Sequence, residues 1–148
     1  MSFESNFEIV LSQVGLMLKQ FLPQLQTTFL KALNDSNRTV RLKAASALCH
    51  LIVIHTRADP LFLELHNGVK NSDDPGVRET TLHALRGVIT AAGEKMSDPL
   101  KKSVYQTLTS MLSHPEDTTR SAAAGCLGAL CRWLTKYDSK YLLFCKIT

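Results

Sequence analysis

The sequence predicts an all-α fold, a right-handed solenoid in which pairs of helices stack in series. Three observations predict it. A segment led by an arginine recurs at Arg41, Arg78 and Arg120, with spacings of 37 and 42 residues. Apolar residues follow each of these arginines at helical spacing. The chain of 148 residues is 45% hydrophobic but holds only 7 Gly and 5 Pro, which is few for a fold rich in strands and turns.

The second helix of each pair begins near these arginines. The positions four, seven and ten residues after each arginine are apolar in all three segments: Ala45, Leu48 and Leu51; Leu82, Leu85 and Val88; Ala124, Leu127 and Leu130. This spacing lines one face of a helix. Four residues before each arginine stands a residue suited to a helix start: Asn37, Asp74 and Glu116. The pattern predicts helices at 37–56, 75–92 and 116–136.

The first helix of each pair opens at a proline, a residue that fits the first turn of a helix. Pro23, Pro60 and Pro99 each precede an apolar stripe, which predicts helices at 23–33, 60–70 and 98–112. A further helix at 4–20 is interpreted as half of an incomplete repeat. Residues 1–136 are therefore predicted to form one repeat domain, with the half-repeat at 4–20 and full repeats at 21–56, 57–93 and 94–136. Residues 137–148 are predicted to be a non-repeat tail.

Particular segments carry a resemblance to a known family. The run at 33–48, LNDSNRTVRLKAASAL, resembles the HEAT repeat, a helix pair related to the armadillo repeat, and the loops are too short for the third armadillo helix. Three further segments are together similar to the C-terminal HEAT region of the general control non-derepressible family of translational activators: LPQLQTTF at 22–29, DPLF at 59–62 and AGCLG at 124–128. The resemblance spans about residues 10–134, and residues 137–148 fit neither the repeat nor the family.

The resemblance implies a non-catalytic protein-binding scaffold. It would be a fragment of a translational activator that supports the initiation-factor-2 alpha kinase on ribosomes during amino-acid starvation. The implied partners are the RWD domain of that kinase and the ribosome, in the cytoplasm. Two alternatives stay open at this point: a HEAT adaptor of another complex, such as a nuclear-transport or phosphatase scaffold, and a module that contacts ribosomal RNA. Neither a small-molecule substrate nor a cofactor is expected.

The arginines and lysines supply the candidate site residues. In HEAT repeats the arginine that opens the second helix bonds a turn carboxylate of a neighbouring repeat, so the resemblance implies a structural ladder of Arg41, Arg78 and Arg120. The expected acceptors are Asp35, Asp73 or Asp74, and Glu116 or Asp117. The two densest basic clusters offer contact with a partner or with phosphate, and their residues are Arg38 and Lys43, and Lys101 and Lys102.

Composition and motifs argue against other classes of protein. The net charge of +4 is only mildly basic, which favours acidic partners over a dedicated nucleic-acid binder. The 4 cysteines contain no Cys-x-x-Cys pair, and no glycine-rich phosphate loop or nucleophile motif is present, so no metal, cofactor or catalytic site is predicted. No apolar run is long enough for a membrane span. The acidic N-terminus predicts no export signal, hence free thiols and a cytoplasmic protein. Three histidines are expected at the surface or in turns: His66, His83 and His114.

Overall fold

The computed structural model describes residues 3–134, with side chains from residue 13 onward. Six α-helices follow one another: α1 (Phe3–Ala32), α2 (Arg38–Ile54), α3 (Asp59–Asn71), α4 (Pro75–Ala92), α5 (Asp98–Met111) and α6 (Asp117–Cys131). A short 3-10 turn, η1 (Gly93–Lys95), follows α4. No strand occurs between residues 3 and 134, and the predicted all-α solenoid is confirmed.

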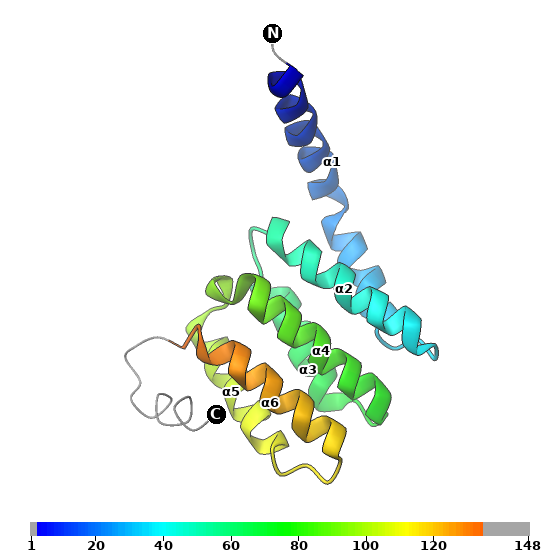
Figure 1. Cartoon of the computed structure of the whole chain (residues 1–148), viewed down its shortest axis with the longest axis vertical. Helices are drawn as coiled ribbons and strands as arrows, with labels where there is room; N and C mark the ends of the chain where they lie inside the picture. The colour runs from blue at the N-terminus through cyan, green and yellow to red at the C-terminus, as the bar shows by residue number, and fades with distance from the viewer. Residues whose placement is uncertain (1–2, 135–148) are drawn as a thin grey trace.

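The helices form two layers (Figure 1). The second helices of the pairs, α2, α4 and α6, lie side by side, and we call them the second-helix layer. Behind them lies the first-helix layer, formed by the C-terminal part of α1, by α3 and by α5. Neighbouring second helices pack closely along their length, whereas neighbouring first helices touch at few points. The stack therefore opens on the side of the first-helix layer.

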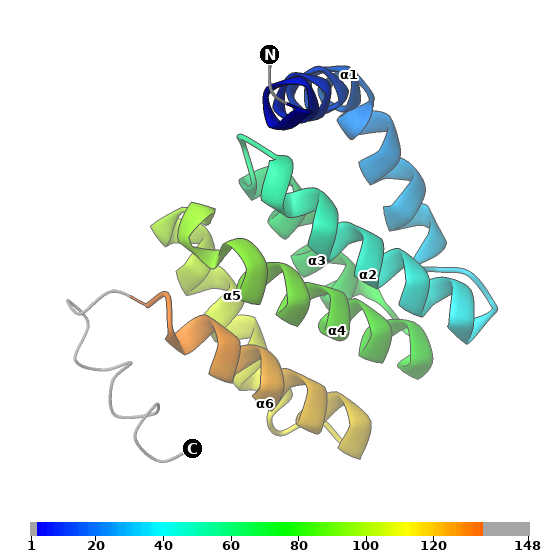
Figure 2. The same ribbon diagram turned by 45° about the horizontal axis from the view of Figure 1, so that its top comes forward.

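Helix α1 differs from the prediction. Two helices were expected, at 4–20 and 23–33, but one helix runs from Phe3 to Ala32 with Pro23 inside it. The other two prolines follow aspartates, Asp59 and Asp98, at true helix starts. No capping residue precedes Pro23, so nothing ends the helix there. A proline inside a helix removes one backbone hydrogen bond and bends the helix. Figure 2 shows α1 bent between its dark-blue and light-blue parts.

The other five helices begin and end within a few residues of their predicted bounds. The one larger difference is at the end of α6, which was predicted to reach residue 136 but ends at Cys131. Residues 132–134 form a turn and a bend, and residues 135–136 lie outside the described residues, as does the predicted tail 137–148.

The core is the shared apolar stripe between the layers. Eight of the nine predicted apolar positions are buried, and Ala124 is exposed. At Leu82, the position that corresponds to Ala124 in the preceding repeat, α4 contacts the following repeat: the Leu82 carbonyl accepts a hydrogen bond from Cys126 Sγ of α6 at 3.0 Å. No helix follows α6 among the described residues, so Ala124 has nothing to cover it.

Close packing within the second-helix layer depends on a glycine. Gly87 of α4 lies against Cys49 of α2, and a Cβ atom added at Gly87 would collide with the Cys49 thiol. The missing side chain thus lets α2 and α4 approach. Gly128 in the interior of α6 is a matched contrast, because no atom of the described residues outside the backbone of its own helix lies within 4 Å of the place its Cβ would take.

These two glycines give opposite predictions. We expect Gly87→Ala to lower the free energy of unfolding by about 1 kcal/mol, because the added methyl displaces the Cys49 side chain. We expect Gly128→Ala to raise it by roughly 0.5–1 kcal/mol, because alanine favours the helix and meets no neighbour. Chemical denaturation of both variants measures the difference, and adding Cys49→Ala should relieve the first variant. Equal stabilisation by both substitutions would contradict the close approach.

Candidate functional site

Arg78 joins two repeats. Its Nη2 donates to the Ser72 carbonyl at 2.6 Å, in the turn of its own repeat, and its Nη1 donates to Glu116 Oε2 at 2.8 Å, in the next repeat. The Thr119 hydroxyl donates to the same Glu116 oxygen at 3.0 Å. The Arg78 side chain is only 11% exposed. One guanidinium thus ties the end of α3 to the start of α6, with little access for competing water.

Arg41 and Arg120 repeat part of this arrangement. Arg41 Nη1 donates to the carbonyls of Asp35 and Ser36, at 2.9 and 3.1 Å, and its Nε donates to the Thr80 hydroxyl of the next repeat at 3.4 Å. Arg120 donates to the turn carbonyls of His114 and Pro115, at 2.7 and 2.9 Å, and pairs with Asp117. The shared feature is therefore an arginine that binds the turn carbonyls five or six residues before it.

The acceptors differ from those expected. Asp35 Oδ1 accepts from the Asn37 N–H at 2.7 Å, and Asp74 Oδ1 accepts from the Val77 N–H at 2.8 Å. Both carboxylates are therefore used at helix starts instead of on a neighbouring arginine. An aspartate just before a helix lies within reach of free backbone N–H groups, and this local bond prevails. Glu116 is the one expected carboxylate that accepts an arginine from another repeat.

The predicted basic clusters do not come together. Arg38 and Lys43 of α2 are exposed, and Arg38 Nη2 lies 3.9 Å from Glu79 Oε1 of α4. Lys102 is exposed on α5, in the other layer. Lys101 is 8% exposed, and its Nζ lies 3.4 Å from Asp98 Oδ1, so its predicted role in an exposed cluster is wrong.

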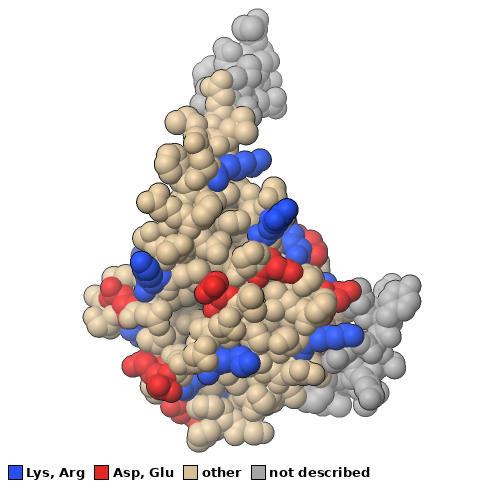
Figure 3. Space-filling view, turned by 180° about the vertical axis from the view of Figure 1, so that it is seen from behind, with Lys and Arg blue, Asp and Glu red and all other residues tan. Residues whose placement is uncertain are grey.

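Lys101 is buried because it lies on the core-facing side of α5, one turn before Val104. Its alkyl stem packs there and its ammonium reaches the helix start. Figure 3 shows the face of the molecule behind Figure 1, where acidic and basic side chains alternate. That face has no continuous basic track for phosphates.

The cysteines and histidines make structural contacts. Burial raises the pKa of the Cys126 thiol to about 12 and also raises the pKa of Cys49, so both free thiols stay protonated at neutral pH. Cys131 is disulfide-bonded, which contradicts the expectation of four free thiols. No group of three or more His, Cys, Asp or Glu side chains in the described part of the chain is placed to hold a metal. Within residues 3–134, no helix has the length and apolar character of a membrane span.

His66 is buried, not at the surface as predicted. Its Nε2 lies 2.7 Å from Thr107 Oγ1, which links α3 to α5 across two repeats. The residue falls on the same face of α3 as Phe62 and Val69, and that face packs inward. Burial lowers the pKa of His66, and the nearby Lys70 charge lowers it further.

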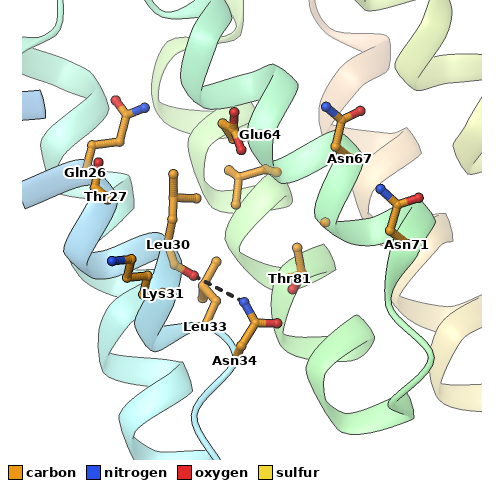
Figure 4. A pocket seen from close by; sticks show the side chains of 12 residues that line it. Gln26, Thr27, Leu30, Lys31, Leu33, Asn34, Glu64, Asn67, Asn71 and Thr81 are labelled. Carbon is orange, nitrogen blue, oxygen red and sulfur yellow. Dashed lines mark hydrogen bonds between the residues drawn. The ribbon is translucent and has the colours of Figure 1, made fainter.

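A groove of about 550 Å³ lies between α1 and α3 (Figure 4). Its lining residues are Gln26, Thr27, Leu30, Lys31, Leu33, Asn34, Glu64, Leu65, Asn67, Gly68, Asn71 and Thr81. The groove opens where the first helices diverge. The groove was not predicted from the sequence, although the spacing of Asn67 and Asn71, one helical turn apart, indicates two amides on one face.

A smaller groove of about 320 Å³ lies on the second-helix layer, between α4 and α6. Its lining includes Glu79, His83, Arg86 and Asp117. Arg86 lies over Gly125, since a Cβ added there would come within 3.0 Å of Arg86 Nη1. Arg86 makes no ion pair with any other described residue, so its charge faces solvent.

Helix pairs joined by arginines that reach into the next repeat define the class of HEAT-repeat proteins, and a HEAT repeat model matches residues 25–55. A second family model, described as stalled ribosome sensor GCN1-like HEAT repeats, matches residues 59–147. The chain belongs to this GCN1-like HEAT family. The matched region includes residues 137–147, which were predicted to lie outside the resemblance.

Comparison with curated proteins leads to the same family. The chain is 56% identical over 138 residues to the human protein named stalled ribosome sensor GCN1, a match that covers 93% of this chain and 5% of that protein. It is 41% identical over 135 residues to the protein ILITYHIA of Arabidopsis thaliana, covering 91% of this chain and 5% of that protein. It is 35% identical over 140 residues to the eIF-2-alpha kinase activator GCN1 of Saccharomyces cerevisiae, covering 94% and 5%. The chain thus spans a small part of these relatives. No solved structure matches it.

The bridging role of Arg78 is testable by its effect on stability. We expect Arg78→Ala to lower the free energy of unfolding by about 1–3 kcal/mol, because the Ser72 carbonyl and the Glu116 carboxylate both lose a partly buried donor. Arg38→Ala is the control, and as a change to an exposed pair it should cost less than about 1 kcal/mol. A double-mutant cycle with Glu116→Gln isolates the contact between repeats. An unchanged melting curve for Arg78→Ala would rule out the structural role.

The buried His66 predicts a loss of stability in acid. Its pKa in the folded chain lies below the ordinary value of 6.5, so the unfolded chain binds the proton first as pH falls. The stability that neutral His66 contributes is therefore complete above pH 6.5 and is lost as pH falls below it. We expect His66→Gln to reduce the drop in melting temperature between pH 7.5 and 5.5. An identical pH dependence in both proteins would contradict the assignment. His55, whose pKa burial also lowers, titrates in both and cancels.

Proposed function

We propose that this chain is a non-catalytic scaffold segment of a cytoplasmic translational regulator, which binds an initiation-factor-2 alpha kinase and the ribosome. Membership of the GCN1-like family carries the proposal, because relatives bear the names stalled ribosome sensor and eIF-2-alpha kinase activator. We infer that the RWD domain of the kinase is the docking partner. The bonds between repeats support a scaffold role, since they hold neighbouring exposed surfaces at a fixed relative orientation.

The exposed side of the second-helix layer is the surface we assign to the kinase. Arg38 and Lys43 project from α2, and Arg86 from α4. The Arg38 charge is only weakly offset by Glu79 at 3.9 Å, and that of Arg86 has no ion-pair partner among the described residues. Such charges cost little to bury against a carboxylate-bearing partner, because they are not already committed to strong pairs. We therefore expect an acidic surface on the docking domain.

The alternatives receive less support. The burial of Lys101 and the alternating charges of Figure 3 disfavour a track for ribosomal RNA on the first-helix side. A nuclear-transport or phosphatase adaptor requires the same fold, but family membership favours translation. We then expect contact with the ribosome to be made with ribosomal proteins, or through isolated basic residues such as Lys102.

Charge reversal tests the kinase surface. We expect Arg38→Glu together with Lys43→Glu to weaken binding of the whole chain to an isolated RWD domain at least tenfold, because two attractive charges become repulsive. Lys102→Glu, on the opposite layer, is the matched control and should leave the affinity within about twofold. Calorimetry gives the affinities, and circular dichroism at 222 nm checks that helicity is retained.

Two outcomes would overturn this assignment. One is that the double variant and the control bind the RWD domain equally well. The other is that the unaltered chain binds ribosomes but not the RWD domain. An affinity for ribosomes that falls steeply with salt, less steeply in Lys102→Glu, would instead support the RNA-contacting alternative.

A further inference from the structure

The groove between α1 and α3 is lined by an unusual concentration of side-chain amides. Gln26 and Asn34 stand on the α1 side, and Asn67 and Asn71 on the α3 side (Figure 4). One of these four amides makes a hydrogen bond within the protein: Asn34 Nδ2 donates to the Leu30 carbonyl at a marginal 3.5 Å. The other three amides make no hydrogen bond with any described residue. Each carries one acceptor and two donors that remain free for a ligand.

The spacing of the α3 amides matches an extended peptide. Asn67 and Asn71 are four residues apart on a helix, which separates them by about 6 Å along the axis. The main-chain N–H and C=O groups on one side of an extended strand recur every two residues, about 6.6 Å apart. A carboxamide offers both a donor and an acceptor, so two of them in this register can each bind one such pair. We propose that the groove binds an extended peptide segment of a partner protein through its main chain.

The rest of the lining fits this ligand. Leu30, which is half-buried, supplies apolar surface for the side chains that point into the groove at every second position. Gly68, between the two asparagines and close to Thr81, leaves the space open, since a Cβ there would already lie 3.3 Å from Thr81 Cγ2. Lys31 stands on the α1 wall and Glu64 on the α3 wall. These two side chains offer one charge of each sign to the side chains of a bound peptide.

This site is separate from the surface assigned to the kinase. The groove lies in the first-helix layer, whereas Arg38, Lys43 and Arg86 project from the second-helix layer. Variants of the groove therefore leave the charge-reversal experiment unaffected, and either assignment can fail alone.

A library of random dodecapeptides displayed on messenger RNA, selected against the whole chain, provides the probe. We expect selected peptides to bind Asn67→Ala/Asn71→Ala about tenfold more weakly than the unaltered chain, because two bidentate amide contacts are lost. Gln106→Ala removes an exposed amide of α5 outside the groove and is the matched control, with less than a twofold effect. The side-chain amide resonances of Asn67 and Asn71 should shift when peptide is added.

Scanning N-methylation of a selected peptide separates main-chain recognition from side-chain recognition. Methyl groups on alternate residues should abolish binding, and those between them should be tolerated, because only one edge of the strand faces the asparagines. A selection that yields no binder, equal affinity for the Asn67→Ala/Asn71→Ala variant, or an N-methyl scan without alternation would each overturn the proposal.

Discussion

The order of the stack depends on one kind of arginine contact, which occurs in two of its repeats. A short turn between two antiparallel helices leaves backbone carbonyls without helical partners. The guanidinium of an arginine five or six residues later donates hydrogen bonds to these carbonyls. Because the guanidinium is planar and has donors in more than one direction, Arg41 and Arg78 still have an N–H free to reach the next repeat. The bond that completes one turn therefore also fixes the position of its neighbour.

The two layers pack unequally because the side chains at their helix contacts differ in size. The second helices approach closely because small residues stand at their contacts, such as Gly87 against Cys49. The first helices carry larger side chains and meet through single contacts, such as His66 with Thr107. Closer spacing on one side than on the other curves a stack and opens grooves on its wider side, and the groove between α1 and α3 lies there. The hollow between α1 and α3 is thus a consequence of the packing, lined by whatever polar residues the first helices expose.

Repetition made most of this fold predictable, and departures from repetition made the rest unpredictable. The arginine period located the helix pairs because every repeat must cover its neighbour's apolar stripe. Pro23 broke the pattern, since it occupies the register of Pro60 and Pro99 without an aspartate before it. Lys101 and His66 were misplaced because residue type suggested solvent, whereas their positions on α5 and α3 point inward. The acceptors Asp35 and Asp74 were wrong for another reason: the sequence places each of them near both an arginine and a helix start, but it does not show which of the two bonds prevails.

A scaffold differs from a simple binding domain because it can bind more than one partner at the same time. The acid-seeking surface of Arg38, Lys43 and Arg86 and the amide-lined groove between α1 and α3 lie on opposite layers, with the shared core between them. Two partners bound at these two proposed sites would therefore not collide. Their relative position is set by the helix pairs, which Arg41 and Arg78 hold in register. We therefore expect a weakened arginine contact to act on both proposed partners together, because it changes the distance between the two surfaces while leaving each surface intact.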